Sequence, residues 1–260
     1  MTSIATQAFT DCSGLISVAI PNSVTSFGGQ VFFHCNNLQY NIYDNARYLG
    51  NKNNPYFVLV EAIDDKIVSC NINQKTKIIA MWAFGYCNNL TTITIPDSVK
   101  AIGDAAFRFC SNLTTITIPD SVKSIGDAAF YFCKNLQYNI YDNAEYLGNT
   151  NNPYLVLISA KDNTISSCNI NQKTKVIADS AFRFCSNLTT ITIPDSVTSI
   201  GYSAFRDCGS LTNVTFKNKN GWKVINNKET QTLQSSSLSN VYTAARYLTS
   251  DYYGYIWERG

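Results

Sequence analysis

Nine cysteines are the side chains of this chain best suited to chemistry, as metal ligands, disulfide partners or nucleophiles. Seven of them end a recurring Ala-Phe-x-x-Cys signature between Cys12 and Cys208, with neighbours 23 residues apart except for two gaps of 52. No C-x-x-C pair exists, so the spacing does not suit a zinc site. A regular period instead predicts one cysteine per repeat, each buried as a small hydrophobic side chain.

Acid-base and metal chemistry have few other candidates. His34 is the only histidine and stands where other repeats have phenylalanine, which favours a surface replacement over a catalytic base. Stacked aspartates could collect Ca²⁺, but turn and capping roles are favoured because each recurs beside a proline or before the signature. The aspartates concerned are Asp97, Asp120, Asp195, Asp104, Asp127 and Asp179. We therefore predict no catalytic residue, no cofactor site and no metal site, and hence no enzyme.

Composition excludes two further classes. Twenty basic and eighteen acidic residues give a formal charge of +2, and no basic run is present, so a nucleic-acid partner is not expected. No stretch approaches eighteen consecutive apolar residues, so we expect no membrane insertion of this chain. The first residues also lack the charged start and apolar stretch of a secretory signal.

The elements that would carry these side chains come from an internal repeat. The segment Leu90-Thr-Thr-Ile-Thr-Ile-Pro recurs almost unchanged at Leu113 and Leu188. It fits the L-x-x-L-x-L pattern of leucine-rich repeats, and a period of 23 lies within their range. Alternation along a strand places Leu90, Ile93 and Ile95 inward and the threonines outward. We predict stacked coils whose core consists of Leu, Ile, Phe and Cys ladders.

Each 52-residue gap is a 23-residue repeat with a 29-residue insertion, at about residues 39–67 and 137–165. The two insertions are copies at an offset of 98 residues. Each is expected to form strand, turn and strand, and the two resulting β-hairpins should project from the solenoid. In the same alignment, Cys70 and Cys168 replace a core isoleucine.

Residues 1–216 are thus predicted to form the solenoid and 217–260 a C-terminal cap. Leu238, Val241, Ala245 and Leu248 recur at helical spacing, and an amphipathic helix there would cover the last coil. Met1 falls in the middle of a repeat, which leads us to expect a longer parent protein. The predicted fold class is a leucine-rich-repeat solenoid, a right-handed superhelix of short parallel strands and short helical turns, with little long helix.

With these motifs placed, the chain resembles the BspA-like family of leucine-rich-repeat surface proteins over residues 1–216. Members occur in mucosal and gut bacteria and in some parasitic protists. The resemblance implies an extracellular or cell-surface location and adhesion to host matrix proteins and other cells. It brings no catalytic residues to this sequence, and the insertions, the cap and the missing signal depart from the usual pattern.

The strand pattern singles out a flat, uncharged outward face as the candidate binding surface for a protein partner, such as a host matrix or cell-surface protein. Its members are Ser69, Asn71, Thr92, Thr94, Thr115, Thr117, Ser167, Asn169, Thr190, Thr192, Asn213 and Thr215. The insertions supply a second candidate, a hairpin surface with Tyr48, Asn53, Tyr146 and Asn151, where exposed tyrosines would stack on a glycan. A purely structural stalk is the third alternative.

Overall fold

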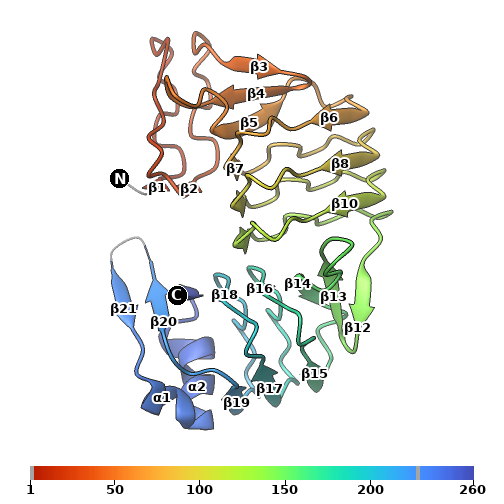
Figure 1. The fold of residues 1–260 in the computed structure, drawn as a ribbon, viewed down its shortest axis with the longest axis vertical. Coiled ribbons are helices and arrows are strands. Elements are labelled where there is room, and N and C mark those ends of the chain that lie inside the picture. The colour runs from red at the N-terminus through yellow and green to blue at the C-terminus, as the bar shows by residue number, and fades with distance from the viewer. Residues whose placement is uncertain (1–2, 227–228) are drawn as a thin grey trace. The chain divides into compact units, whose positions relative to one another are not determined.

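The computed structural model describes residues 3–226 and 229–260, so Met1, where the chain enters in mid-repeat, lies outside the described residues. The chain divides into two compact units, Met1–Gln137 and Tyr138–Gly260. Each unit contains one of the two insertions. The units are described separately below, and Figure 1 labels their helices and strands.

The first unit consists of short strands wound into coils (Figure 1). Its strands are β1 (Ser3–Ile4), β2 (Ser26–Phe27), β3 (Asn41–Tyr43), β4 (Ala46–Leu49), β5 (Val58–Ala62), β6 (Ser69–Asn71), β7 (Ile78–Ile79), β8 (Thr92–Thr94), β9 (Ala101–Ile102), β10 (Thr115–Thr117) and β11 (Ser124–Ile125). β1 and β2 pair with each other, β6, β8 and β10 form one parallel sheet, and β3, β4, β5, β7, β9 and β11 form another. A regular coil therefore contributes two strands, of which the sequence pattern predicted only the first.

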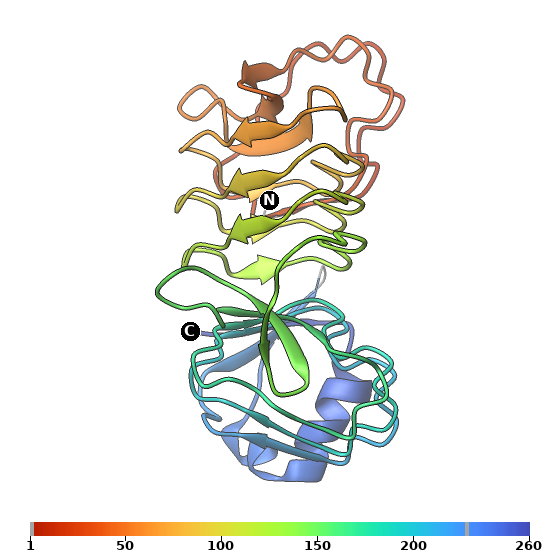
Figure 2. The same cartoon turned by 90° about the vertical axis from the view of Figure 1, so that its right-hand side faces the viewer.

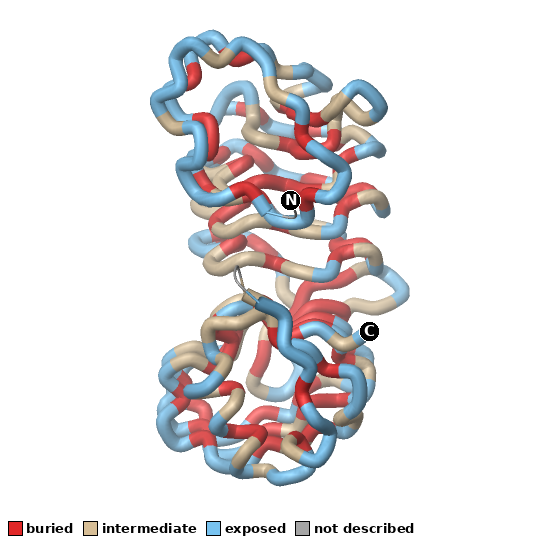
Figure 3. The backbone as a smooth tube through the Cα atoms, turned by 90° about the vertical axis from the view of Figure 1, so that its left-hand side faces the viewer, coloured by how far each residue is buried: buried red, intermediate tan, exposed pale blue. Residues whose placement is uncertain are grey.

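The predicted inward and outward assignment is confirmed. In β8, Ile93 is buried while Thr92 and Thr94 are exposed. Figure 3 colours the backbone by burial and shows buried and exposed stretches alternating along the coils. Cys70 of β6 pairs in register with Ile93 of β8, so this cysteine takes the place of a core isoleucine. Because parallel pairing aligns equivalent positions of successive coils, like side chains stack on like. The ladders expected from the repeat are therefore present.

Between its second strand and the next leucine, each regular coil runs through a turn segment that we call the arm, residues 103–112 in one example. Phe107 of this arm is buried, and its ring stacks on Phe84 at 5.2 Å and on Phe130 at 5.4 Å. The arm consists of hydrogen-bonded turns and not of α-helix, because Ala105 and Phe109 have positive φ angles of 51° and 63°. Left-handed residues at this spacing interrupt any helical turn.

Alternate N–H groups of an arm point in different directions. The N–H groups of Ala106 and Arg108 donate to carbonyls within the arm, whereas that of Phe107 donates to Ala129 of the following coil at 2.8 Å. Ala105 and Phe109 likewise donate to the following coil. The Asp104 carboxylate also bridges coils, since it accepts from the Asp127 N–H at 3.0 Å and does not cap a helix. Successive arms are thus joined by a ladder of main-chain hydrogen bonds that all run toward the C-terminus.

Gly103 is explained by close contact and not by the turn expected from the sequence. Its φ is not positive, but a Cβ at this position would lie 2.5 Å from the Met81 backbone nitrogen of the preceding coil. Gly126 meets the Asp104 backbone nitrogen at the same distance. The glycine permits the backbones of adjacent coils to approach each other.

The insertion contains the predicted hairpin, formed by β4 and β5, but it does not project. β5 pairs in parallel with β7 and so joins the second sheet of the solenoid, and β3 extends that sheet beyond β4. Buried side chains explain the difference, because Ala46, Tyr48 and Leu49 on β4 are covered. The tip is also tied down, since the Asn54 side-chain amide donates to the Lys75 carbonyl at 2.8 Å.

The second unit repeats this plan and ends in the predicted cap region (Figures 1 and 2). Its elements are β12 (Asn139–Tyr141), β13 (Ala144–Leu147), β14 (Val156–Ala160), β15 (Ser167–Asn169), β16 (Val176–Ile177), β17 (Thr190–Ile193), β18 (Ser199–Ile200), β19 (Asn213–Phe216), β20 (Trp222–Ile225), β21 (Thr230–Thr232), α1 (Ser235–Ser239), α2 (Val241–Arg246), the π-helical turn η1 (Tyr247–Asp251) and β22 (Ile256–Arg259). β15, β17 and β19 form one parallel sheet. The remaining strands form the other sheet, which β22 extends by antiparallel pairing with β18.

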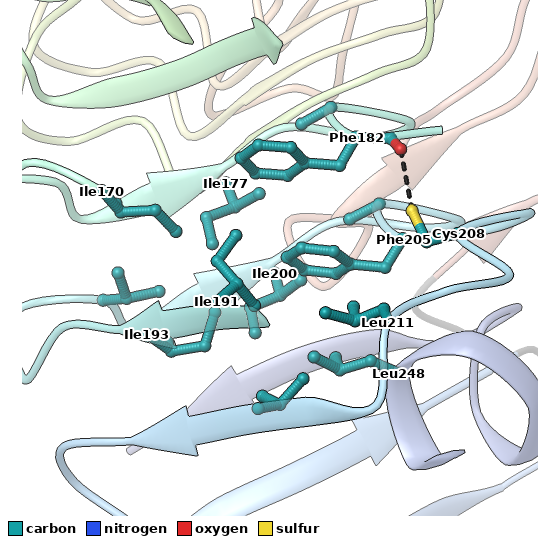
Figure 4. Close-up of a cluster of buried hydrophobic side chains, with 14 of the residues drawn as sticks. Ile170, Ile177, Phe182, Ile191, Ile193, Ile200, Phe205, Cys208, Leu211 and Leu248 are labelled. Atoms are coloured by element: carbon teal, nitrogen blue, oxygen red, sulfur yellow. Dashed lines mark hydrogen bonds between the residues drawn. The ribbon is translucent and has the colours of Figure 1, made fainter. Parts of the chain in front are cut away.

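The core of the second unit continues from the coils into the cap. Figure 4 shows Phe182 above Phe205, with the Cys208 thiol donating to the Phe182 carbonyl at 3.0 Å. Leu248 of the cap packs into the same cluster. The expected single helix is divided at Asn240, whose extended backbone ends α1 and whose side chain accepts from two N–H groups at the start of α2. An Asn in this role is a favourable N-cap, which explains why a new helix begins there.

Candidate functional site

The strand face, defined by the twelve outward Ser, Thr and Asn residues named above, forms two parallel three-stranded surfaces, one in each unit. In the first, Ser69, Thr92 and Thr115 lie in one row across β6, β8 and β10. A second row holds Asn71, Thr94 and Thr117. The equivalent rows of the second unit lie across β15, β17 and β19. Short uncharged side chains in register give each unit an even polar surface.

Ten of the twelve strand-face residues are exposed, and Thr192 and Thr215 are half-buried. The insertion closes one edge of this surface in each unit. The Asp44 carboxylate accepts from the Asn71 N–H at 2.7 Å, and the Asn45 side-chain amide donates to the Ser69 carbonyl at 2.8 Å. Asp142 and Asn143 do the same for β15. The turn between the first two insertion strands therefore covers a strand edge that would otherwise be open to pairing.

The predicted hairpin surface is only partly exposed. Asn53 and Asn151 at the two tips are exposed, as expected. The prediction is wrong for Tyr48 and Tyr146, whose side chains are 0% exposed. Each points into the core, and its hydroxyl accepts a backbone N–H at 3.3 Å, from Asn73 and Asn171 respectively. The hairpin alternation places these rings inward because β4 and β13 are central strands and not exposed edges.

A groove of about 920 Å³ lies in the first unit, and sequence reasoning missed it. Its floor is the outer surface of the insertion strands, where Ile42, Arg47 and Glu61 stand side by side on β3, β4 and β5. Arg47 Nη1 lies 2.6 Å from Glu61 Oε1, so the floor carries both charges as a partly exposed pair. One wall is the arm between Gly28 and Asn36, and the other is formed by Ala80, Met81, Trp82 and Tyr86.

The groove exists because the inserted coil lacks a full arm. Leu59 is in register with Ile79, and Ser69 with Thr92, so residues 60–66 stand in place of the ten residues 80–89 of the next coil. This connection is three residues shorter and has no counterpart of the Phe and Cys of the signature. The sequence did contain a signal for this groove, because the Ala-Phe-x-x-Cys signature is missing between Cys35 and Cys87.

A row of surface aromatic rings continues from one groove wall along the arms of the first unit. Trp82 stacks on Tyr86 at 5.5 Å, Tyr86 stacks on Phe109 at 4.9 Å, and Phe109 lies 5.3 Å from Phe132. The Arg108 guanidinium lies 5.4 Å from the Trp82 ring, within cation-π range. Four of these five residues occupy recurring positions of the repeat. Their rings line up in a row only because the coils are stacked.

The aromatic residues occupy unfavourable backbone positions. Tyr86, Phe109 and Phe132 have φ angles of 65°, 63° and 62°, a left-handed region that costs bulky residues roughly 1–2 kcal/mol. Asp207, at the equivalent place in a later arm, has a side chain better suited to this conformation. The same arm position is also left-handed at Asp11, His34 and Phe184, so this conformation belongs to the repeat.

The cysteines provide no reactive site in the buried part of the coils. All nine are free thiols, and eight are buried as predicted. Cys12 is the exception and is exposed, because it lies in the first coil of the described chain and only the following coil stacks on it. Burial raises the pKa of the Cys70 and Cys168 thiols to about 12. Such thiols are protonated at neutral pH and are weak nucleophiles.

His34 is exposed, as its isolated occurrence suggested, and its Nδ1 lies 2.8 Å from Asp11 Oδ1. The recurring aspartates act locally or between coils. Asp104 and Asp179 each accept a backbone N–H from the following coil, and Asp195 pairs with Arg259 at 3.2 Å.

In residues 3–226 and 229–260, no helix is long and apolar enough to cross a membrane.

A family model agrees with this repeat architecture. The chain belongs to the family of BspA type leucine-rich repeat regions, whose model matches six copies over residues 1–53, 63–151 and 160–249. No curated protein sequence matches the chain. Proteins of this repeat family are generally non-catalytic, and a binding or scaffold role fits the fold.

Several solved structures are similar. A leucine-rich repeat protein from Bacteroides ovatus is 25% identical, with a TM-score of 0.39, over 84% of this chain and 60% of that one. A leucine-rich cell surface protein from Faecalibacterium prausnitzii is 28% identical, with a TM-score of 0.32, over 82% and 60%. The T. pallidum leucine-rich repeat protein is 22% identical, with a TM-score of 0.38, over 68% and 71%. The chain thus spans about 60% of the length of the first two.

Proposed function

We propose that this chain is an adhesin-type binding module of the cell surface or the extracellular space, and that its strand face contacts a protein partner. The observation that carries the proposal is the in-register rows of exposed Ser, Thr and Asn on two three-stranded sheets. Hydroxyl and amide groups both donate and accept hydrogen bonds, so such rows suit a polar protein surface. In this proposal, residues 1–216 present the binding surface and residues 217–260 cover the end of the second unit.

The partner class follows from the surface chemistry and the family. The strand face contains no charged residue, so long-range electrostatic attraction contributes little and contact must rest on close fit. A host matrix protein or a cell-surface protein meets this requirement by offering extended polar surfaces. The duplicated 98-residue module supplies two similar surfaces on one chain, and linked weak sites raise avidity through effective concentration.

The experiment places long charged side chains on the strand face. One variant carries Thr92→Lys and Thr115→Lys, and a second carries the equivalent changes Thr190→Lys and Asn213→Lys. All four positions are exposed and lie in the first row of their unit. Binding to immobilised extracellular-matrix proteins and to epithelial cells is then measured by surface plasmon resonance and by flow cytometry.

We expect each double variant to weaken binding about tenfold, because a Lys side chain prevents close approach and introduces an unpaired charge. Combining all four changes should abolish it, because avidity is then lost as well. The matched control is Gln74→Lys with Gln172→Lys, two exposed positions of the same module outside the strand face. If the four-lysine variant binds as well as the control while its melting temperature is unchanged, the strand face is not the site.

A further inference from the structure

The groove in the first unit lies where the regular stack of arms is interrupted, so main-chain groups that are paired elsewhere lack their usual partners there. In regular coils, Trp82, Phe84 and Tyr86 donate to carbonyls of the following arm. The equivalent N–H groups on the wall of the groove belong to Gln30, Phe32 and His34. Within residues 3–226 and 229–260, these three donate to no protein carbonyl.

The opposite wall shows the complementary gap. By the same pattern, the carbonyls of Met81, Ala83 and Gly85 should accept N–H groups from a preceding arm. The Ala62 N–H of β5 supplies the bond to Ala83 at 2.7 Å. In the described chain, the carbonyls of Met81 and Gly85 accept no backbone N–H. Gln30, Phe32 and His34 line one wall of the groove and Met81 lines the other, so the groove has three main-chain donors on one side and the Met81 carbonyl as an acceptor on the other. Unpaired main-chain groups favour a ligand that pairs them.

The ring ladder of the arms is interrupted at the same place. Phe32 stacks on Phe9 at 5.5 Å, and its other side faces the groove, whereas Phe107 in a regular coil is stacked on both sides. Phe27, Phe32 and Leu38 line the groove while remaining largely buried, so its inner part is apolar. Phe84, the next ring along the ladder, is 0% exposed and does not line the groove, so the space offers an aromatic side chain a position beside Phe32 alone.

We propose that this groove binds an extended peptide segment of a protein partner, with an aromatic side chain placed against Phe32. A peptide backbone supplies carbonyls for the N–H groups of Gln30, Phe32 and His34 and an N–H group for the Met81 carbonyl, as added strands do in sheet-edge recognition. The groove volume of about 920 Å³ lies within the range of roughly 300–1,000 Å³ that is usual for ligand pockets. Trp82 and Tyr86 stand on one wall and cover the peptide from the outside.

The charge of the floor narrows the choice of peptide. Arg47 and Glu61 neutralise each other, and among the residues that the structure describes no other Asp, Glu, Lys or Arg lines the groove. A strongly acidic or basic segment therefore gains nothing there, and an uncharged segment with small residues beside the aromatic one is favoured. The chain's own arm, Gly-Asp-Ala-Ala-Phe-Arg-Phe-Cys, supplies a suitable starting sequence, in which the flanking charges are replaced.

The test uses the full chain and the peptide Gly-Asn-Ala-Ala-Phe-Gln-Phe-Ser, with a second peptide in which both phenylalanines are alanine. Affinity is measured by isothermal titration calorimetry. Hydrogen exchange then follows the N–H groups of Gln30, Phe32 and His34. Ile42→Trp fills the groove from the edge strand β3. Ile16→Trp is the control, because Ile16 is also an exposed isoleucine but lies outside the groove.

We expect the phenylalanine peptide to bind at least about tenfold more tightly than the alanine peptide. It should slow exchange at the three N–H groups, and Ile42→Trp but not Ile16→Trp should weaken it. Failure of the phenylalanine peptide to bind at millimolar concentration, equal binding of both peptides, or equal effects of both substitutions would overturn the proposal. A neutral hexasaccharide is added as a parallel probe, and its binding in the groove without binding of the phenylalanine peptide would also overturn the proposal.

The two binding sites are tested separately, because no strand-face residue lines the groove. Loss of binding in the four-lysine variant with peptide binding retained supports both proposals, and the reverse combination rejects both. The groove proposal can therefore hold when the strand-face proposal fails.

Discussion

Replacing Phe107 by alanine is the most direct test of the stacked core. The side chain is 0% exposed and its ring is sandwiched between Phe84 and Phe130, with interplanar angles of 6° and 5°. Truncating a buried phenylalanine to alanine costs about 3–5 kcal/mol through lost transfer energy and a residual cavity. Each aromatic pair adds about 0.5–1.5 kcal/mol beyond area burial. We therefore expect Phe107→Ala to lie at the upper end of that range.

Phe84 provides the internal comparison. It is equally buried, but within the described part of the chain only the Phe107 ring stacks on it, because the preceding inserted coil lacks an arm. Phe84→Ala should therefore cost less than Phe107→Ala by about 0.5–1.5 kcal/mol, the value of one aromatic pair. Thr94→Ala on the strand face is the outward control and should fall within about 0.5 kcal/mol of the native chain.

Urea unfolding followed by circular dichroism measures these differences. Two compact units need not unfold in one transition, so hydrogen exchange in β8 and β10 should accompany it to confirm that the loss lies in the first unit. Equal costs for Phe107→Ala and Thr94→Ala would mean that inside and outside have been assigned wrongly. Equal costs for Phe107→Ala and Phe84→Ala would show that the second stacked ring adds nothing.

Two further predictions concern titratable side chains. At pH 8, Ellman's reagent should modify only the exposed Cys12 thiol rapidly. A pKa of about 12 leaves the buried Cys70 thiol with roughly one thiolate in 10⁴. Rapid modification of several thiols would refute the buried cysteine ladder. Burial raises the pKa of Asp104, so its charged form lowers stability as pH rises through the folded pKa. Asp104→Asn keeps an oxygen for the Asp127 N–H and should raise the melting temperature at pH 7, with the gain disappearing below about pH 4. A gain independent of pH would exclude this explanation.

Much of the fold was predictable because the repeat states each position several times. Alternation along the strand predicts that Thr92 and Thr94 point outward and Ile93 inward, and the 23-residue alignment predicts that Cys70 replaces a core isoleucine. All of these predictions are confirmed. The second strand of each coil was missed because it spans only two residues, as in Ala101–Ile102. A pattern with a period of two cannot be recognised over so short a segment.

The insertions were harder to predict for a different reason. Alternation in Ala46–Leu49 marks a strand, but it does not say whether that strand is an edge or lies between neighbours. Pairing with β3 on one side and β5 on the other makes β4 a central strand, and pairing of β5 with β7, twenty positions away in sequence, joins the hairpin to the solenoid. Tyr48 was therefore expected on a surface although it is buried.

The candidate sites show the same limit. Exposure of the strand face could be predicted from single strands, whereas the groove depends on an arm that is absent. Its walls come from Gln30 and Trp82, which are far apart in sequence and meet across the shortened connection of residues 60–66. Only the spacing between Cys35 and Cys87 pointed to this place, and the sequence does not show whether the space is filled.

The one-way ladder between arms makes the two ends of any stack of coils chemically different. An arm at one end offers only free N–H groups and an arm at the other only free carbonyls, so identical ends cannot pair with each other. In the second unit, the Ser203 N–H donates to the Tyr253 carbonyl at 2.8 Å, so the C-terminal segment takes the part of one more coil. A whole 23-residue coil can thus be gained or lost in the middle without changing either terminus. Variation in length by complete repeats is therefore compatible with one unchanged terminal cap.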